Sequence, residues 1–244
     1  MHDAARLYAA LDATWPAAGL CEMGPWLIRK GERGGQRVSA AVVRDGTNPA
    51  EIDAAEIDAA KSEMLRLGQE PIFQIRPEWD AALDQRLAEM GYFIRDPVIF
   101  YQAPLTRLAQ GSALPVLHIW PPLAMACDIW QTGGIGAERV AVMHRARGPK
   151  AAFLARKENR PAGAAFVAID GDIAMLHAME VPGYARRKGA GKDMLRAAAD
   201  WAASQHAETL ALVVTRANLA ARALYDSLQM TPTGGYHYRV AQPA

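Results

Sequence analysis

A short basic segment with two glycines constrains the fold of this chain more than any other feature. It reads Arg186-Arg187-Lys188-Gly189-Ala190-Gly191-Lys192 and contains four cations. The run before it, Ile173 to Val181, is largely apolar and predicts a buried strand. The run after it, Met194 to Ala207, has apolar residues at helical spacing. The segment is therefore predicted to be a turn that joins a strand to the N-terminus of a helix.

Four cations in this turn indicate a bound anion. A helix N-terminus carries a partial positive charge of about half a unit, so each exposed cation there costs roughly 0.3–1 kcal/mol. Gly189 and Gly191 lack a Cβ and let a ligand approach the backbone, where the first N–H groups of the helix are free donors. This combination is typical of a phosphate or pyrophosphate cradle. A tight turn with a solvated basic rim is the alternative.

Two phosphate-binding motifs with fixed spacing do not fit the turn. The P-loop needs a Ser or Thr after its lysine, and Asp193 follows Lys192. The dinucleotide fingerprint needs a third glycine, and Met194 occupies that position. The cradle is therefore of another kind.

A second motif follows downstream. The apolar run Leu210 to Val214 predicts a central strand. Asn218 then stands at an N-cap position, and Tyr225 lies on the apolar stripe of the following helix, where alone it predicts a core residue. Arg-x-x-Gly-x-Gly at 186–191 and Asn-x-x-Ala-x-x-Leu-Tyr at 218–225 together resemble the GNAT superfamily of acyl-CoA-dependent N-acyltransferases. The resemblance extends from about Leu114 to Val240.

The resemblance implies an N-acetyltransferase that uses acetyl-CoA and no metal. Tyr225 is expected near the CoA sulfur, where it protonates the departing thiolate. The Gly-Phe that commonly closes the second motif is Gln229-Met230 here, which weakens the signal for the end of the helix. The residues expected to bind the cofactor lie on the strand, on the turn and at the second helix start: Met179, Val181, Arg186, Arg187, Lys188, Gly189, Ala190, Gly191, Lys192 and Asn218.

The acceptor amine needs a base, because a primary amine has a pKa near 10 and attacks a thioester only after losing a proton. Glu180 is the first candidate and His177 the second, and a structural role is the alternative for each. Strand alternation places these two side chains on opposite faces unless a bulge intervenes, and the family typically has a bulge there. Transfer is expected to be direct, with backbone N–H groups stabilising the oxyanion.

The first half of the sequence shows a faint copy of the same plan. Strands are expected at Val38–Val43, Pro71–Ile75 and Val98–Tyr101, and helices at Glu51–Leu67 and Asp80–Met90. When the two halves are aligned, Asp80 corresponds to Asn218, but Leu87 corresponds to Tyr225. The N-terminus of the helix predicted from Glu51 is already satisfied by nearby carboxylates, including Asp53 and Glu56. We therefore expect two tandem domains of α+β (mixed α/β) class, each a mixed, mostly antiparallel sheet flanked by helices. Residues 1–108 form a degenerate GNAT-like domain and 109–244 the catalytic domain, with a linker from Ala103 to Pro115. An unrelated α+β domain is the alternative for the first half.

The second half is expected to run strand, two helices, three strands, helix, strand, helix and strand. Its first helices carry Trp130 and lead into the loop Thr132 to Gly136. Either Trp120, Trp130 and this loop form a mobile apolar wall of the acceptor pocket, or the tryptophans are ordinary core residues.

Charge and composition exclude several classes of function. The formal net charge of +1 gives no overall attraction to nucleic acid or membrane. No apolar stretch is long enough for a membrane span, and Cys21, Cys127 and the six histidines lack metal-ligand spacing. The expectation is a cytoplasmic monomer or homodimer acting on a small-molecule or peptide amine. A non-catalytic acyl-CoA sensor and a protein binding another phosphate ligand are the alternatives.

Overall fold

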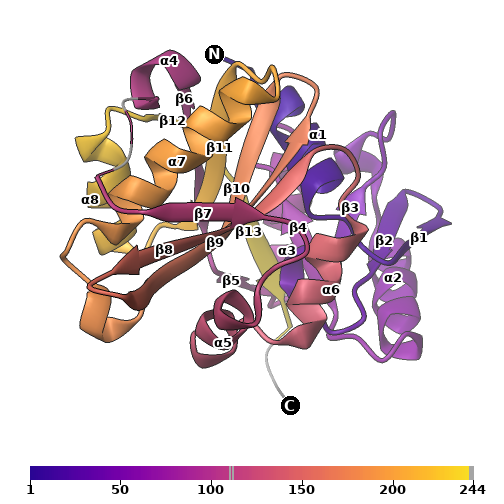
Figure 1. Cartoon of the computed structure of the whole chain (residues 1–244). Helices are drawn as coiled ribbons and strands as arrows, with labels where there is room; N and C mark the ends of the chain where they lie inside the picture. Colours follow the sequence, from indigo (N-terminus) through magenta and orange to yellow (C-terminus); the bar gives the residue numbers. More distant parts are fainter. Residues whose placement is uncertain (110, 112, 242–244) are drawn as a thin grey trace. The chain divides into compact units, whose positions relative to one another are not determined.

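The computed structural model describes residues 1–109, 111 and 113–241 and divides into two compact units (Figure 1). The first unit combines residues 1–16, 100–214 and 218–233. The second combines residues 17–99, 215–217 and the described residues from 234 onward. The predicted boundary between residues 108 and 109 does not coincide with this division, because each unit takes segments from both halves of the sequence.

The first unit is built on a seven-stranded sheet with the order β12-β6-β11-β10-β9-β8-β7. Strands β10 and β11 are parallel, whereas β7–β8, β8–β9, β9–β10 and β12–β6 are antiparallel. The mixed, mostly antiparallel sheet is thus confirmed. In sheet order, the strands are β12 (Thr231–Thr233), β6 (Val98–Pro104), β11 (Thr209–Thr215), β10 (Ile173–Glu180), β9 (Arg160–Asp170), β8 (Lys150–Lys157) and β7 (Val116–Ile119).

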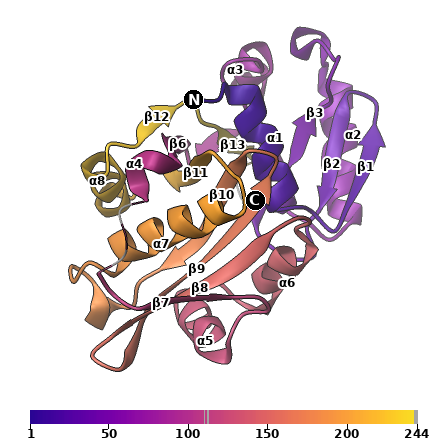
Figure 2. The ribbon, with the colours of Figure 1, turned by 45° about the horizontal axis from the view of Figure 1, so that its top comes forward.

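Helices cover both faces of this sheet (Figure 2). On one face lies α7 (Ala190–Ser204), whose Trp201 ring packs 5.8 Å from that of Phe153. On the other face, the Trp15 ring that follows α1 (Ala4–Thr14) packs 6.2 Å from Phe166. The same face carries α5 (Ala124–Thr132) and α6 (Ala137–Arg145). The predicted order of helices and strands in the second half is confirmed as far as α8 (Leu219–Ser227), but two strands, β12 and β13, follow it where one was predicted.

Strand β6 belongs to a different sheet from the one expected. Val98–Tyr101 was predicted to close the sheet of the first half, but β6 lies between β12 and β11 in the first unit. Phe100 is 0% and Tyr101 1% exposed, as befits a strand covered on both faces, because adjacent side chains point to opposite faces. The predicted linker is also wrong over residues 103–108, which form the end of β6 and the short helix α4 (Leu105–Leu108). Ser112 of that predicted linker lies outside the described residues.

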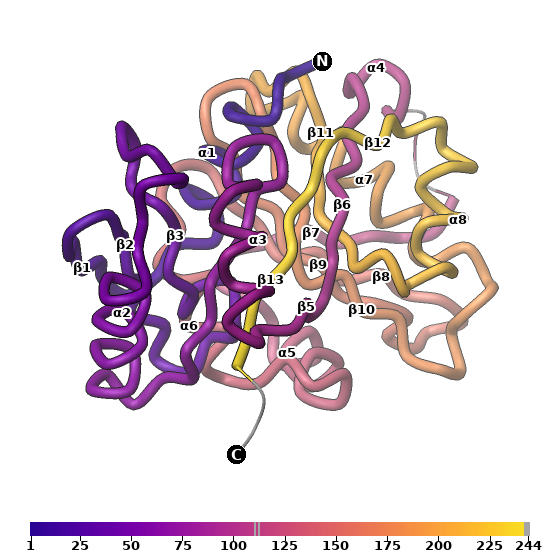
Figure 3. The backbone as a smooth tube through the Cα atoms, turned by 180° about the vertical axis from the view of Figure 1, so that it is seen from behind, coloured from indigo at the N-terminus to yellow at the C-terminus, as the bar shows by residue number. Residues whose placement is uncertain are grey.

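The second unit has a six-stranded sheet, and one of its strands comes from the C-terminal part of the chain. The order is β1-β2-β3-β4-β13-β5, and β13 is antiparallel to both of its neighbours. Figure 3 shows β13 running beside β5 and α3 (Ala81–Glu89). Its strands are β1 (Gly19–Met23), β2 (Trp26–Lys30), β3 (Ala41–Val43), β4 (Ile72–Ile75), β5 (Phe93–Arg95) and β13 (His237–Val240).

The core of this unit lies between the sheet and two helices. Ile57 and Met64 of α2 (Ala54–Arg66) and Leu87 of α3 are buried against Phe73. Leu87 is thus a core residue at the position that the sequence comparison aligned with Tyr225.

Several predicted bounds in this unit differ from the structure. Gln36–Val38 is a 3₁₀ turn, so the strand predicted from Val38 begins only at Ala41. The helix predicted from Glu51 begins at Ala54, because Asp53 and Glu56 form a reciprocal capping box there. That box confirms that carboxylates satisfy this helix start. The β1–β2 hairpin was missed, although Gly24-Pro25 is a turn signal.

Candidate active site

The glycine turn has the backbone geometry of an open helix N-terminus. Gly189 caps α7 with φ +90°, a left-handed conformation that favours glycine. The first helical hydrogen bond runs from the Asp193 N–H to the Gly189 oxygen, at 3.0 Å. The N–H groups of Ala190, Gly191 and Lys192 therefore precede the helical ladder and lack an acceptor within it. Such a set of donors suits an anion.

Three elements meet at Gly191. A Cβ there would lie 3.0 Å from Leu224 Cδ2 of α8 and 4.0 Å from Met179 Cε of β10. The missing side chain thus allows close packing of α7 on α8, in addition to opening the turn. The same geometry places Met179, a predicted cofactor ligand, beside the glycine turn.

Strands β10 and β11 separate at the point where the site begins. Their parallel pairing ends at Leu176 and Leu212, although β10 continues to Glu180 and β11 to Thr215. The edge of β10 that faces β11 is therefore unpaired beyond Leu176, next to the N-terminus of α7, whereas its other edge stays paired with β9.

The expected bulge in β10 is present and determines which side chains share a face. The register with β9 shifts between His177 and Glu180, where Ala178 has φ +51°. His177 is opposite Phe166 and Glu180 is opposite Ala164, two residues away on β9. Residues two apart on a strand share a face, as do directly opposed residues. His177 and Glu180 therefore lie on one face, the one that carries α5, rather than on opposite faces.

His177 is held in the core. It is 4% exposed, and its Nε2 lies 2.9 Å from Thr14 Oγ1 at the end of α1. Its ring centroid lies 5.0 Å from that of Trp15 and 6.1 Å from that of Phe166. The second candidate base is therefore enclosed by α1 and neighbouring rings.

Glu180 lies at the more open end of the same face. Its side chain is 23% exposed, and its Oε1 lies 3.6 Å from a terminal nitrogen of Arg186. The Arg186 Nε also donates to the Val181 oxygen at 3.0 Å, so this predicted cofactor ligand folds back onto the end of β10. A Cβ on Gly133, just after α5, would lie 2.6 Å from Glu180 Cγ. Gly133 thus leaves the space that the Glu180 side chain fills.

Trp130 fixes the bulge, a role that the sequence analysis missed. It is fully buried, and its Nε1 donates to the Ala178 oxygen at 2.8 Å. The one signal in the sequence was an indole in an apolar helix, since a buried indole N–H needs an acceptor. Trp120 lies 5.4 Å from the Phe166 ring, with the Lys150 ammonium 4.8 Å from its own ring. Trp130 is therefore core, and Trp120 is a packed ring of the same face.

Tyr225 is buried on α8 against a strand from the first half of the sequence. It is 5% exposed, and its ring lies 5.3 Å from that of Tyr101 of β6. Burial, with a smaller contribution from Tyr101, raises the pKa of Tyr225 well above its usual value, so the phenol stays protonated. Within the described part of the chain, its hydroxyl makes no hydrogen bond. It is an available proton donor.

The other predicted residues surround the same turn. Asn218 Oδ1 accepts from the Ala221 N–H at 3.1 Å, which confirms the predicted N-cap of α8. Arg187 has φ +61°, and the Lys188 oxygen accepts from Lys157 Nζ at 3.3 Å. The structure thus brings the predicted cofactor residues together around the end of β10 and the starts of α7 and α8.

Two features of other kinds of site are absent from residues 1–109, 111 and 113–241. There, no three His, Cys, Asp or Glu side chains are grouped so as to hold a metal ion. None of the helices in these ranges is both long and apolar enough to cross a bilayer.

Comparisons with known proteins agree with this geometry. The sequence model of the acetyltransferase (GNAT) family matches residues 118–229. The chain is 26% identical to an uncharacterised N-acetyltransferase of Bacillus subtilis (strain 168), YobR, over 98% of this chain and 99% of that protein. Its fold is similar to a GCN5-related N-acetyltransferase from Kribbella flavida, with a TM-score of 0.71 and 19% identity over 100% and 97% of the two chains. It is also similar to a tandem GNAT protein from the clavulanic acid biosynthesis pathway, with a TM-score of 0.62 and 16% identity over 84% and 76%. Residues 118–229 therefore match the GNAT acetyltransferase family, and the chain is similar in sequence and fold to N-acetyltransferases.

Proposed function

We propose that this enzyme transfers the acetyl group of acetyl-CoA directly to a primary amine of a small molecule or peptide. The observation that carries the proposal is the splayed end of β10 beside the open N-terminus of α7. The edge of β10 left unpaired by β11 gives room for an extended arm next to free backbone donors. A bound anionic group would then neutralise the four cations of the turn, which would otherwise repel one another.

Each part of the turn has a role in binding. The N–H groups of Ala190, Gly191 and Lys192 would hold the pyrophosphate, with the side chains of Arg187 and Lys188 adding positive charge. Met179 and Val181 would line the arm along the open end of β10, and Asn218 would keep the start of α8 in place. Acetyl-CoA supplies an activated acyl thioester when bound.

Glu180 is the proposed base. Its carboxylate lies on the face of α5 and can accept a proton from the ammonium form of the acceptor, directly or through one water. His177 is the weaker candidate because Thr14 and two aromatic rings enclose it. Tyr225, protonated because it is buried, would give its proton to the departing sulfur.

Release of free thiol from acetyl-CoA in the presence of a panel of amines tests the activity. Amine-dependent thiol release supports the proposal. Binding of acetyl-CoA without thiol release across the panel would favour the sensor alternative. A thermal shift with ATP or an oligonucleotide but not with acetyl-CoA would favour a different phosphate ligand.

Gly133→Ala is expected to impair Glu180 without touching the cofactor residues. Gly133 has φ −82°, so alanine is allowed by the backbone, but its Cβ would collide with the Glu180 side chain. Because the carboxylate is displaced rather than removed, we expect kcat/KM for the amine to fall about 10-fold, less than the full loss of a base. KM for acetyl-CoA should change little. Steady-state kinetics with each substrate varied in turn measures both quantities.

Two controls isolate the cause. Gly183→Ala is the matched substitution, since a Cβ there meets no atom within 4 Å, and it should leave the rates unchanged. In a Glu180→Gln background, Gly133→Ala should cost nothing further, because the group that it displaces is already inactive. An additive loss in the double variant would show that Gly133 acts independently of Glu180.

A further inference from the structure

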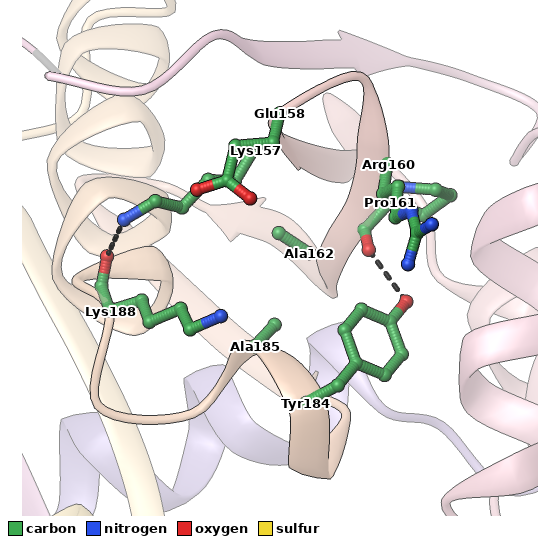
Figure 4. Close-up of a pocket in the computed structure, with 8 residues that line it drawn as sticks. All are labelled: Lys157, Glu158, Arg160, Pro161, Ala162, Tyr184, Ala185 and Lys188. Carbon is green, nitrogen blue, oxygen red and sulfur yellow. Dashed lines mark hydrogen bonds between the residues drawn. The ribbon is translucent and has the colours of Figure 1, made fainter.

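A small cavity lies beside the glycine turn, between the β8–β9 turn and the 3₁₀ turn Gly183–Ala185 (Figure 4). Its volume is about 140 Å³. A water molecule takes roughly 30 Å³ in the liquid, so a small anion with some of its hydration fits. The lining residues are Lys157, Glu158, Arg160, Pro161, Ala162, Tyr184, Ala185 and Lys188.

The lining is basic and incompletely neutralised. The lining contains three cations, Lys157, Arg160 and Lys188, and a single carboxylate, Glu158. Within the described ranges, the side chains of Arg160 and Lys188 have no hydrogen-bond or ion-pair partner. Figure 4 shows the Lys188 ammonium directed into the space between the two turns. Like charges gathered in a small concave site raise the local concentration of anions.

Two hydrogen bonds hold the walls of the cavity together. Tyr184 donates from its hydroxyl to the Pro161 oxygen at 2.7 Å. Lys157 donates from Nζ to the Lys188 oxygen at 3.3 Å. The hairpin is thereby joined to the segment that enters the glycine turn. The cavity and the cradle are also neighbours along the chain, because Lys188 directly precedes Gly189 and successive Cα atoms are about 3.8 Å apart.

We propose that this cavity binds a phosphate monoester, the 3′-phosphate on the ribose of CoA, while the glycine turn binds the pyrophosphate. The inference rests on the proposed function. A phosphate monoester carries a charge of about −1.5 to −2 at pH 7, which matches the surplus of two positive charges in the lining. Arg160 offers a planar pair of donors suited to phosphate oxygens, and Lys188 offers a point charge between the two phosphate positions. The same ribose carries both groups, so seating one brings the other close to Lys188.

Calorimetric titration with CoA and with 3′-dephospho-CoA tests the site. We expect the intact protein to bind CoA at least about 10-fold more tightly at low salt, as a charge-assisted contact of about 1.4 kcal/mol implies. Arg160→Gln and Lys188→Gln should each bring this ratio toward one, chiefly by weakening CoA. The ratio is measured within one protein sample, so a change in the folded fraction does not alter it.

Arg147→Gln is the matched control, since Arg147 is exposed, lies outside the cavity and loses the same charge. It should leave the ratio unchanged. Equal affinity of the intact protein for the two ligands would overturn the phosphate site while leaving the proposed function standing. An equal effect of Arg147→Gln and Arg160→Gln on the ratio would assign the preference to overall charge and also overturn the site. Failure of both ligands to bind would overturn the proposed function itself.

Discussion

Replacement of Tyr225 by phenylalanine is expected to lower kcat by roughly 10²–10⁴, the range for loss of a general acid. The phenylalanine ring keeps the contact with Tyr101 and stays buried on α8, so folding and acetyl-CoA binding should change little. KM for acetyl-CoA should therefore stay near the wild-type value. Single-turnover measurements, in which chemistry is not masked by product release, give the decisive rate.

The pH dependence follows from the direction of the pKa shift. The proton-donating form of Tyr225 is the neutral phenol, and burial raises its pKa above the usual value near 10. The donor is thus present across neutral and mildly alkaline pH, and wild-type kcat should show no fall from its ionisation up to about pH 9. Tyr101→Phe is the matched control, because it removes the other hydroxyl of the ring pair and should retain turnover. Wild-type kcat in Tyr225→Phe would return that residue to a purely packing role.

Gly191→Glu is expected to abolish stabilisation by acetyl-CoA. At a ligand concentration of about 100 times Kd, wild type should gain about 2.7 kcal/mol, or roughly 5–10 °C in Tm for a chain of this size. A glutamate at residue 191 places a carboxylate among the N–H donors proposed for the pyrophosphate. The variant should therefore show no shift with ligand, measured by thermal melts with and without acetyl-CoA.

The packing of Gly191 requires a second variant. Any Cβ there approaches Leu224 Cδ2 to 3.0 Å, so Gly191→Glu also lowers the Tm of the free protein. Gly191→Ala adds the same Cβ without the charge, and the flexible end of Leu224 can yield. Gly191→Ala should therefore keep the rise in Tm that acetyl-CoA produces in the wild type. A full shift in Gly191→Glu would place the cofactor away from the turn.

The local part of the site could be predicted from the sequence because its signals are local. Gly189 marks a left-handed turn, and Asn218 supplies a cap three residues before its donor, at Ala221. Each of these signals depends on a few neighbouring residues. Apolar periodicity likewise predicted the order of the helices and strands in the second half as far as α8.

The parts that could not be predicted depend on contacts between distant segments. A buried strand pattern shows that β6 and β13 are covered, but it does not identify the neighbouring strands. Residues 98–101 were therefore placed in the sheet of the first half, and the end of the chain in the domain of the second half. The bulge at Ala178 gives φ +51° to a residue that ordinarily avoids it, and the Trp130 indole that binds the Ala178 oxygen is 48 residues away. No run of neighbouring residues shows that His177 and Glu180 share a face.

The position of β13 has a consequence for the chain during its synthesis. In the sheet of the second unit, β5 pairs with β13, and His237 follows Arg95 by 142 residues. At about 5–20 residues per second, a ribosome needs roughly 7–30 s to cover that interval. Throughout it, the facing edges of β4 and β5 have no partner and offer their backbone groups to any other extended chain. We therefore expect the nascent chain to expose these strand edges to other chains until β13 has been synthesised, and faster elongation between residues 95 and 237 to shorten that exposure.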